Sequence, residues 1–213
     1  MLMKNDRVFK MLAALALAGM LLFSSALAQT VEPYRRALPE DLGGLIFSAT
    51  VGAYDPADGA FSVTVYEVDA YDPAAITALR AGDTLVFCDA PHTVKSMGQS
   101  PMDGLEIAFE DGEELLFDAM EGGILIASNA TGDQICMHPA AEIRLKPAAD
   151  ILLTDSSDPE KDQPEITVGL ENILTLQAQR SAESIGFDYS VTTVALNAAG
   201  EIESILLVYA PWQ

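Results

Sequence analysis

The stretch DGLEIAFEDGEELLFDAMEGGILIAS, residues 103–128, carries the pattern that decides the fold of this chain. From Leu105 to Phe109 every second residue is large and apolar, and the residues between them are glutamate or alanine. Such alternation is typical of a strand that buries one face. Asp-Gly and Gly-Gly pairs separate the runs, and they suit tight hairpin turns because glycine tolerates a positive φ. The stretch therefore predicts short antiparallel strands joined by hairpins.

The same alternation recurs on both sides of this stretch, and it predicts a mainly β protein. The predicted strands are 43–53, 60–69, 83–88, 92–97, 104–110, 113–118, 123–128, 134–138 and 141–145. One or two helical turns are predicted at 73–79, because proline suits the first helical position. Many short strands with frequent turns indicate an antiparallel barrel or sandwich.

The composition changes near the C-terminus. DSSDPEKDQPE, residues 155–165, has no apolar side chain and two prolines, so it reads as an exposed linker. Beyond it, apolar residues at helical spacing predict a helix that Thr167 could cap, followed by strands near 187–196 and 201–210. This short αββ C-terminal element either forms a subdomain or completes the main sheet. The predicted organisation is a signal peptide at 1–28, a main β domain at 29–153, an acidic linker at 154–165 and the αββ element at 166–213.

The N-terminus has the features of a secretory signal peptide. Basic residues lie within the first ten positions, an apolar run extends from Met11 to Leu22, and Ala26 and Ala28 supply the small residues that signal peptidase requires. The apolar run is shorter than the roughly 20 residues of a membrane span. We therefore expect cleavage after Ala28, no membrane span in the mature chain, and a secreted or extracytoplasmic location.

The chain is strongly acidic, with a formal net charge of −21. Cleavage after Ala28 removes three of the 11 basic residues and one of the 32 acidic ones, and takes the net charge to −23. A field of this sign repels phosphate backbones and anionic lipid head groups. Nucleic acid is therefore not expected as a partner, and the charge is typical of a soluble exported protein.

Both cysteines and both histidines lie in two short stretches, Cys88 to His92 and Cys136 to His138. In an exported protein two cysteines usually form a disulfide, so we expect a bond between Cys88 and Cys136. Two alternatives stay open. The cysteines could be free and buried, or all four residues could bind a metal, because thiolate and imidazole suit zinc.

One part of the chain resembles the sortases, a family of exported β-barrel transpeptidases. ITALRAGDTLVFCDAPHTV, residues 76–94, is similar to the hairpin with a Gly-Asp turn in that family. Cys136 and Arg144 have the spacing of its nucleophile and arginine. Gly-Asp-Gln-Ile precedes Cys136 where the family has Thr-Leu-x-Thr, and no histidine precedes the hairpin. The resemblance would imply a thiol-dependent enzyme with Cys136 as nucleophile.

Weighing these patterns, we expect an acidic, non-catalytic protein with a binding or structural role outside the cytoplasm. Its partner would be another protein or a surface, and no cofactor or catalytic residue is predicted. The alternatives are a metal-binding protein using the four residues above and, after it, the sortase-like enzyme. Tyr209 and Trp212 are weak candidates for a ligand platform near the C-terminus.

Overall fold

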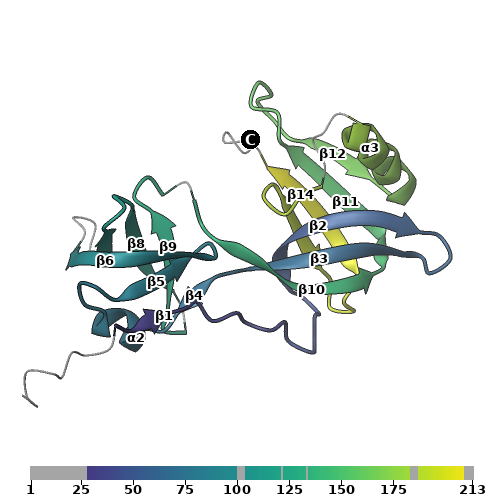
Figure 1. Cartoon of the computed structure of the whole chain (residues 1–213). Helices are drawn as coiled ribbons and strands as arrows, with labels where there is room; N and C mark the ends of the chain where they lie inside the picture. The colour runs from purple at the N-terminus through teal and green to yellow at the C-terminus, as the bar shows by residue number, and fades with distance from the viewer. Residues whose placement is uncertain (1–27, 100–103, 121, 133, 183–186, 209–213) are drawn as a thin grey trace, which may run out of the picture.

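The computed structural model describes residues 28–99, 104–120, 122–132, 134–182 and 187–208, and within them the fold is mainly β. Two open sheets of seven strands each are present, with one longer helix near the C-terminus (Figure 1). The predicted mainly β fold class is confirmed. Of the predicted barrel and sandwich, the fold is sandwich-like, because neither sheet closes into a barrel. Except for Ala28, the predicted signal peptide lies outside the described residues.

The first sheet contains the hairpins that the alternation predicted. In spatial order its strands are β1 (Thr30–Val31), β5 (Thr84–Phe87), β6 (Ala90–Gln99), β7 (Leu105–Phe109), β8 (Glu114–Met120), β9 (Ile124–Asn129) and β4 (Ala70–Tyr71). All neighbours are antiparallel except β1 and β5. The short helix α2 (Pro73–Ala78) begins after Asp72, whose carboxylate accepts a hydrogen bond from the backbone of Ala74. Ile76 of this helix is fully buried in the core of the first sheet.

The second sheet combines strands from two separate parts of the sequence, 46–68 and 137–208. Its order is β10 (Met137–Leu145), β3 (Ala60–Val68), β2 (Ile46–Asp55), β13 (Thr192–Leu196), β14 (Ile202–Val208), β11 (Pro147–Ser156) and β12 (Glu165–Val168). Helix α3 (Leu170–Ala182) covers the inner face, where Ile173 is fully buried among the strand residues. The αββ segment thus completes a sheet, since β13 and β14 lie at its centre.

The chain leaves the second sheet after β3 and returns to it at β10, so each of the two sheets has its own core. β3 ends at Val68 and β10 begins at Met137, and all strands of the first sheet except β1 lie between them in sequence. The buried residues accordingly form two separate clusters, one for each sheet. The ribbons of β3 and β10 connect the two halves of the molecule (Figure 1). This crossing is the place where side chains from both halves meet.

Several boundaries differ from the sequence expectation. The strands predicted at 134–138 and 141–145 are a single strand, β10, with a bulge between Pro139 and Ala141 that keeps both parts paired with β3. Thr167 does not cap α3 but pairs with Leu153 inside β12, so that part of the prediction is wrong.

The segment predicted as an acidic linker connects two paired strands. The pairing of β11 with β12 ends at Asp155 and Glu165. Residues 157–164 form the loop between the two strands. β12 was not predicted from the sequence because it is four residues long and mostly exposed. β11 was missed because an alanine-rich start hides its short apolar run.

Candidate functional site

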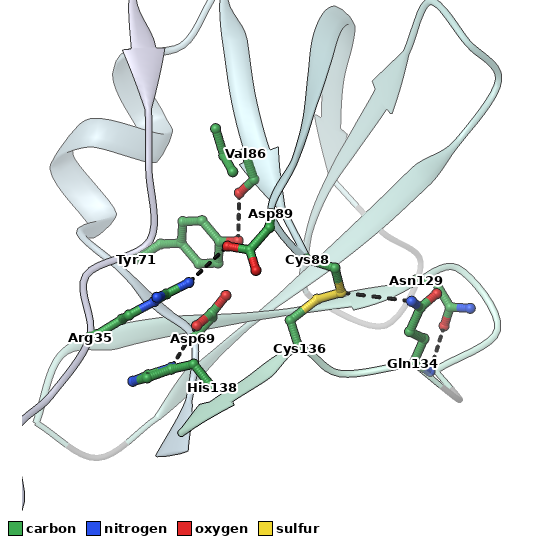
Figure 2. The surroundings of a disulfide bond; sticks show 10 residues. All are labelled: Arg35, Asp69, Tyr71, Val86, Cys88, Asp89, Asn129, Gln134, Cys136 and His138. Atoms are coloured by element: carbon green, nitrogen blue, oxygen red, sulfur yellow. Dashed lines mark hydrogen bonds and ion pairs between the residues drawn. A yellow bond between two sulfur atoms is a disulfide. The ribbon is translucent and has the colours of Figure 1, made fainter. Parts of the chain in front are cut away.

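Cys88 and Cys136 meet at the crossing between the two halves of the molecule. Cys88 lies in the loop between β5 and β6, and Cys136 directly precedes β10. Their Cα atoms are 5.2 Å apart, a distance that suits a disulfide, and the structure joins their sulfur atoms (Figure 2). The bridge attaches the tip of a hairpin in the first sheet to the start of the strand that returns to the second.

The loop that carries Cys88 has an unusual backbone. Phe87 pairs with Ala90, so Cys88 and Asp89 form a two-residue hairpin loop, and both have a positive φ, of 49° and 61°. Loops of this kind favour Asn-Gly, because a positive φ costs other residues roughly 1–2 kcal/mol. Here both residues are anchored from outside. Cys88 is bonded to Cys136, and the Asp89 carboxylate accepts a hydrogen bond of 2.8 Å from Arg35.

A buried aspartate–histidine pair lies beside the bridge. Nδ1 of His138, on β10, is 2.8 Å from Oδ1 of Asp69, which separates β3 from β4 (Figure 2). Both side chains are only 5% exposed. The backbone N–H of Asp69 also donates to the carbonyl of Cys136, at 2.9 Å. Side-chain and backbone bonds together therefore fix the point where the chain leaves and re-enters the second sheet.

Tyr71 completes this buried cluster. Its hydroxyl donates a hydrogen bond of 2.9 Å to the carbonyl of Val86. Burial, and secondly the negative charge of Asp69, raise the pKa of Tyr71 well above its ordinary value. The phenol consequently stays protonated and acts as a fixed donor. Nε2 of His138 is buried and has no hydrogen-bond partner within the described part of the chain.

The hydrogen-bond partner of His92, Asp111, lies outside this cluster. On β6 its Nδ1 is 2.8 Å from Oδ2 of Asp111, and its ring packs against Phe109 with the centroids 5.2 Å apart. The hydrogen bond from His92 lowers the pKa of Asp111 below its ordinary value. Each histidine thus has its own aspartate, while the cysteines bond to each other. Across residues 28–208, leaving aside those not described, no group of three or more His, Cys, Asp or Glu is placed to hold a metal ion.

The structure does not bring together the two residues of the sortase resemblance. β10 is one extended strand from Met137 to Leu145, so Cys136 and Arg144 lie roughly 25 Å apart along it. The guanidinium of Arg144 bonds instead to Asp58, at 3.0 Å, and to Asp55, at 3.3 Å. Tyr209 and Trp212 lie outside the described residues.

A cleft of about 590 Å³ lies between the end of β2 and helix α3. The side-chain amide of Gln177 donates to the carbonyls of Val51 and Gly52, at 2.9 and 3.0 Å, and so attaches the helix to the strand. Of its described lining residues only Glu171 carries a charge. These described residues include no cluster of groups for acid–base or nucleophilic chemistry.

The outer face of the second sheet, opposite α3, carries a row of apolar side chains. The register aligns Ile46, Ala195, Ser204, Leu152 and Val168 across five adjacent strands, and paired residues point to the same face. Ile46 is 71% exposed, Leu152 38% and Val168 55%. Ile166, two residues before Val168 and on the same face, is 65% exposed. Four large apolar side chains on this face are therefore exposed.

Where the five strands β2, β13, β14, β11 and β12 are regularly paired, the outward positions of this face are uncharged. They are Ile46, Ser48, Thr50, Thr193, Ala195, Ser204, Leu206, Val208, Leu152, Thr154, Ser156, Ile166 and Val168. The exposed side chains of Asp150 and Glu203 lie at the register shifts of β11 and β14. A fifth of the residues in the chain are charged, yet none at the regularly paired outward positions is. Beside them Tyr66 of β3 stacks on Tyr189, with the ring centroids 3.9 Å apart. Composition and exposure distinguish this face from an ordinary solvated one.

Sequence reasoning found the cysteines and histidines but missed their partners and the outer face. Asp69 and Asp111 are two among 32 acidic residues, and no local pattern marks either. The Ile-Thr-Val alternation at 166–168, which begins two residues after Pro164, was the signal that could have revealed an exposed apolar strand.

The comparisons with known proteins add no constraint, since no protein-family model, curated protein or solved structure matches this chain. In the described part of the chain, every helix is too short or too polar to cross a membrane.

Proposed function

We propose that this chain is an exported, non-catalytic binding module whose outer face on the second sheet binds a partner outside the cytoplasm. The exposed apolar side chains of Ile46, Leu152, Ile166 and Val168, which lie on one face of the second sheet, are the observation that carries this proposal. Contiguous exposed apolar surface on a soluble protein marks an interaction site more often than chance. The strong net charge of the chain keeps it soluble despite this surface.

The bonds that the cysteine and histidine side chains make support a non-catalytic role. A cysteine nucleophile must be a thiolate, and Cys88 and Cys136 are bonded to each other. His138 is buried with Asp69, and His92 is bound to Asp111. None of these four side chains lines the cleft between β2 and α3, whereas acid–base and nucleophilic catalysis require reactive groups that converge on a substrate site.

Export is supported by the disulfide and by the first described residues. Disulfides persist mainly in oxidising compartments. The backbone N–H of Gln29 donates to Oδ1 of Asp83, at 2.8 Å. After cleavage behind Ala28, Gln29 would carry an α-ammonium group at this position and could keep the contact as an ion pair.

We expect the mature protein to begin at Gln29. The small residues Ala26 and Ala28 and the contact between Gln29 and Asp83 lead to this expectation. Intact-mass measurement of protein isolated from its native host should show the loss of residues 1–28. Recovery of chains that retain Met1 would contradict export by a cleaved signal peptide.

The binding role can be tested by crosslinking from the outer face. A photoactivatable side chain at Leu152 should give a discrete adduct when the mature protein is illuminated with the surface fraction of its host. Excess unlabelled protein should suppress the adduct, and an unlabelled variant with Ile46→Asp and Leu152→Asp should not. The same side chain at Lys95, exposed on β6 of the other sheet, is the matched control. Equal adducts from both positions, or none from Leu152, would overturn the proposal.

A further inference from the structure

The two edges of the second sheet differ in how they are protected against pairing with another strand. β10, at one edge, contains Pro139, a bulge and the charged side chains of Glu142 and Arg144. These are features by which natural proteins block an open edge. β12, at the other edge, has no bulge, proline or lysine in its four residues. Within the described residues β12 is paired on one side only, with β11 (Figure 1).

The side chains of β12 offer apolar contacts at alternate positions. Ile166 and Val168 point to the outer face and are 65% and 55% exposed. Successive residues of a strand alternate between faces, so a strand added at this edge would place every second side chain beside them. An added strand would also satisfy backbone N–H and C=O groups on the free side of β12, apart from the carbonyl of Val168, which already accepts a hydrogen bond of 2.9 Å from Nδ2 of Asn172.

The loop that precedes β12 gives this edge a negative charge. Asp158, Glu160, Asp162 and Glu165 are exposed, and the single cation among them is Lys161. Lys161 lies 2.6 Å from Glu165 and 3.6 Å from Asp158, so its charge is already shared between two carboxylates. Glu160 and Asp162 have no ion-pair partner in the described part of the chain. Charge complementarity therefore favours a basic partner at this end of the strand.

We propose that β12 is a docking edge for an extended, basic segment of a partner protein, which adds to the second sheet as an eighth strand. The inference rests on the proposed function and specifies its partner: apolar side chains at alternate positions contact Ile166 and Val168, and lysine or arginine side chains contact the acidic loop. A second copy of this chain fits less well, because each chain carries a net charge of −21 and the copies repel each other.

The test uses a labelled seven-residue peptide in which valine alternates with lysine and threonine. Fluorescence anisotropy should show saturable binding to the mature protein. Replacing the lysines of the peptide by glutamate, or methylating alternate backbone nitrogens, should weaken binding at least about tenfold, since the first change removes charge attraction and the second removes strand hydrogen bonds. Glu160→Gln with Asp162→Asn should weaken binding and reduce its dependence on salt.

Matched variants separate strand addition from general attraction to an acidic protein. Ile166→Asp should weaken peptide binding at least about tenfold. Thr93→Asp places the same charge at an exposed position on β6 of the first sheet, outside the proposed binding face, and should leave binding unchanged. Both sites are exposed, so folding is preserved, as circular dichroism would verify.

Three results would overturn the inference. They are equal binding to the wild type and to Ile166→Asp, tolerance of backbone methylation, and dimerisation of the mature protein through β12 in place of peptide binding. None of these affects the adduct expected from Leu152. That adduct tests the broader proposal that the outer face binds a partner, so the two proposals fail separately.

Discussion

Removing the Cys88–Cys136 bridge should lower the free energy of unfolding by about 4 kcal/mol. The two residues are separated by 48 positions, and in the chain-entropy model a closed loop of this size restricts the unfolded chain by about that amount. The bridge also anchors Cys88 at a positive φ, which an unbonded loop would readily abandon. Chemical denaturation of the wild type and of a variant with Cys88→Ala and Cys136→Ala measures the difference.

The double variant also supplies the control for reduction. A reductant should shift the unfolding midpoint of the wild type towards that of the variant and should leave the variant unchanged. Reaction of two thiols per native molecule with an alkylating reagent, without prior reduction, would show that the bridge is not formed. An unfolding free energy unaffected by the substitutions would show that the crossing is held by other contacts alone.

Strands β5 to β9 of the first sheet were predictable because their side chains report burial directly, whereas the two-residue strands β1 and β4 were not predicted. From Leu105 to Phe117 each inward position is apolar and each turn is marked by glycine, so local pattern and final register agree. Strand β12 was not predictable in this way. Its apolar residues face outward, so the usual link between apolar character and burial is reversed there.

The site was predictable only in part, because its residues come from distant parts of the sequence. The number of cysteines and the predicted signal peptide favoured a pairing of Cys88 with Cys136, and this needed no knowledge of topology. The aspartate beside His138 depends on the crossing of β3 and β10, which places residues 69 positions apart in contact. The insertion of the first sheet between these strands leaves no mark in the local sequence.

His138→Ala should be the most damaging substitution of a single charged or polar side chain at the crossing. It removes the partner of a carboxylate that is 5% exposed, and breaking a buried pair in this way costs about 3–5 kcal/mol. The pair of His92 and Asp111 has the same 2.8 Å separation, but the Asp111 side chain is 49% exposed. Solvent can replace the lost partner there. In double-mutant cycles the coupling energy between His92 and Asp111 should therefore be much smaller than that between His138 and Asp69.

A second substitution distinguishes loss of the buried partner from loss of packing. Once His138 is absent, Asp69→Asn removes the uncompensated charge while nearly preserving the shape of the side chain, so the double variant should be more stable than His138→Ala alone. In the wild-type background the same Asp69→Asn substitution should destabilise the protein, because it weakens the bond to His138. Opposite signs in the two backgrounds, measured by denaturant unfolding, are expected only if the cost arises from a buried charge. Equal effects in both backgrounds would mean that His138 acts at the crossing through its volume and not through its bond to Asp69.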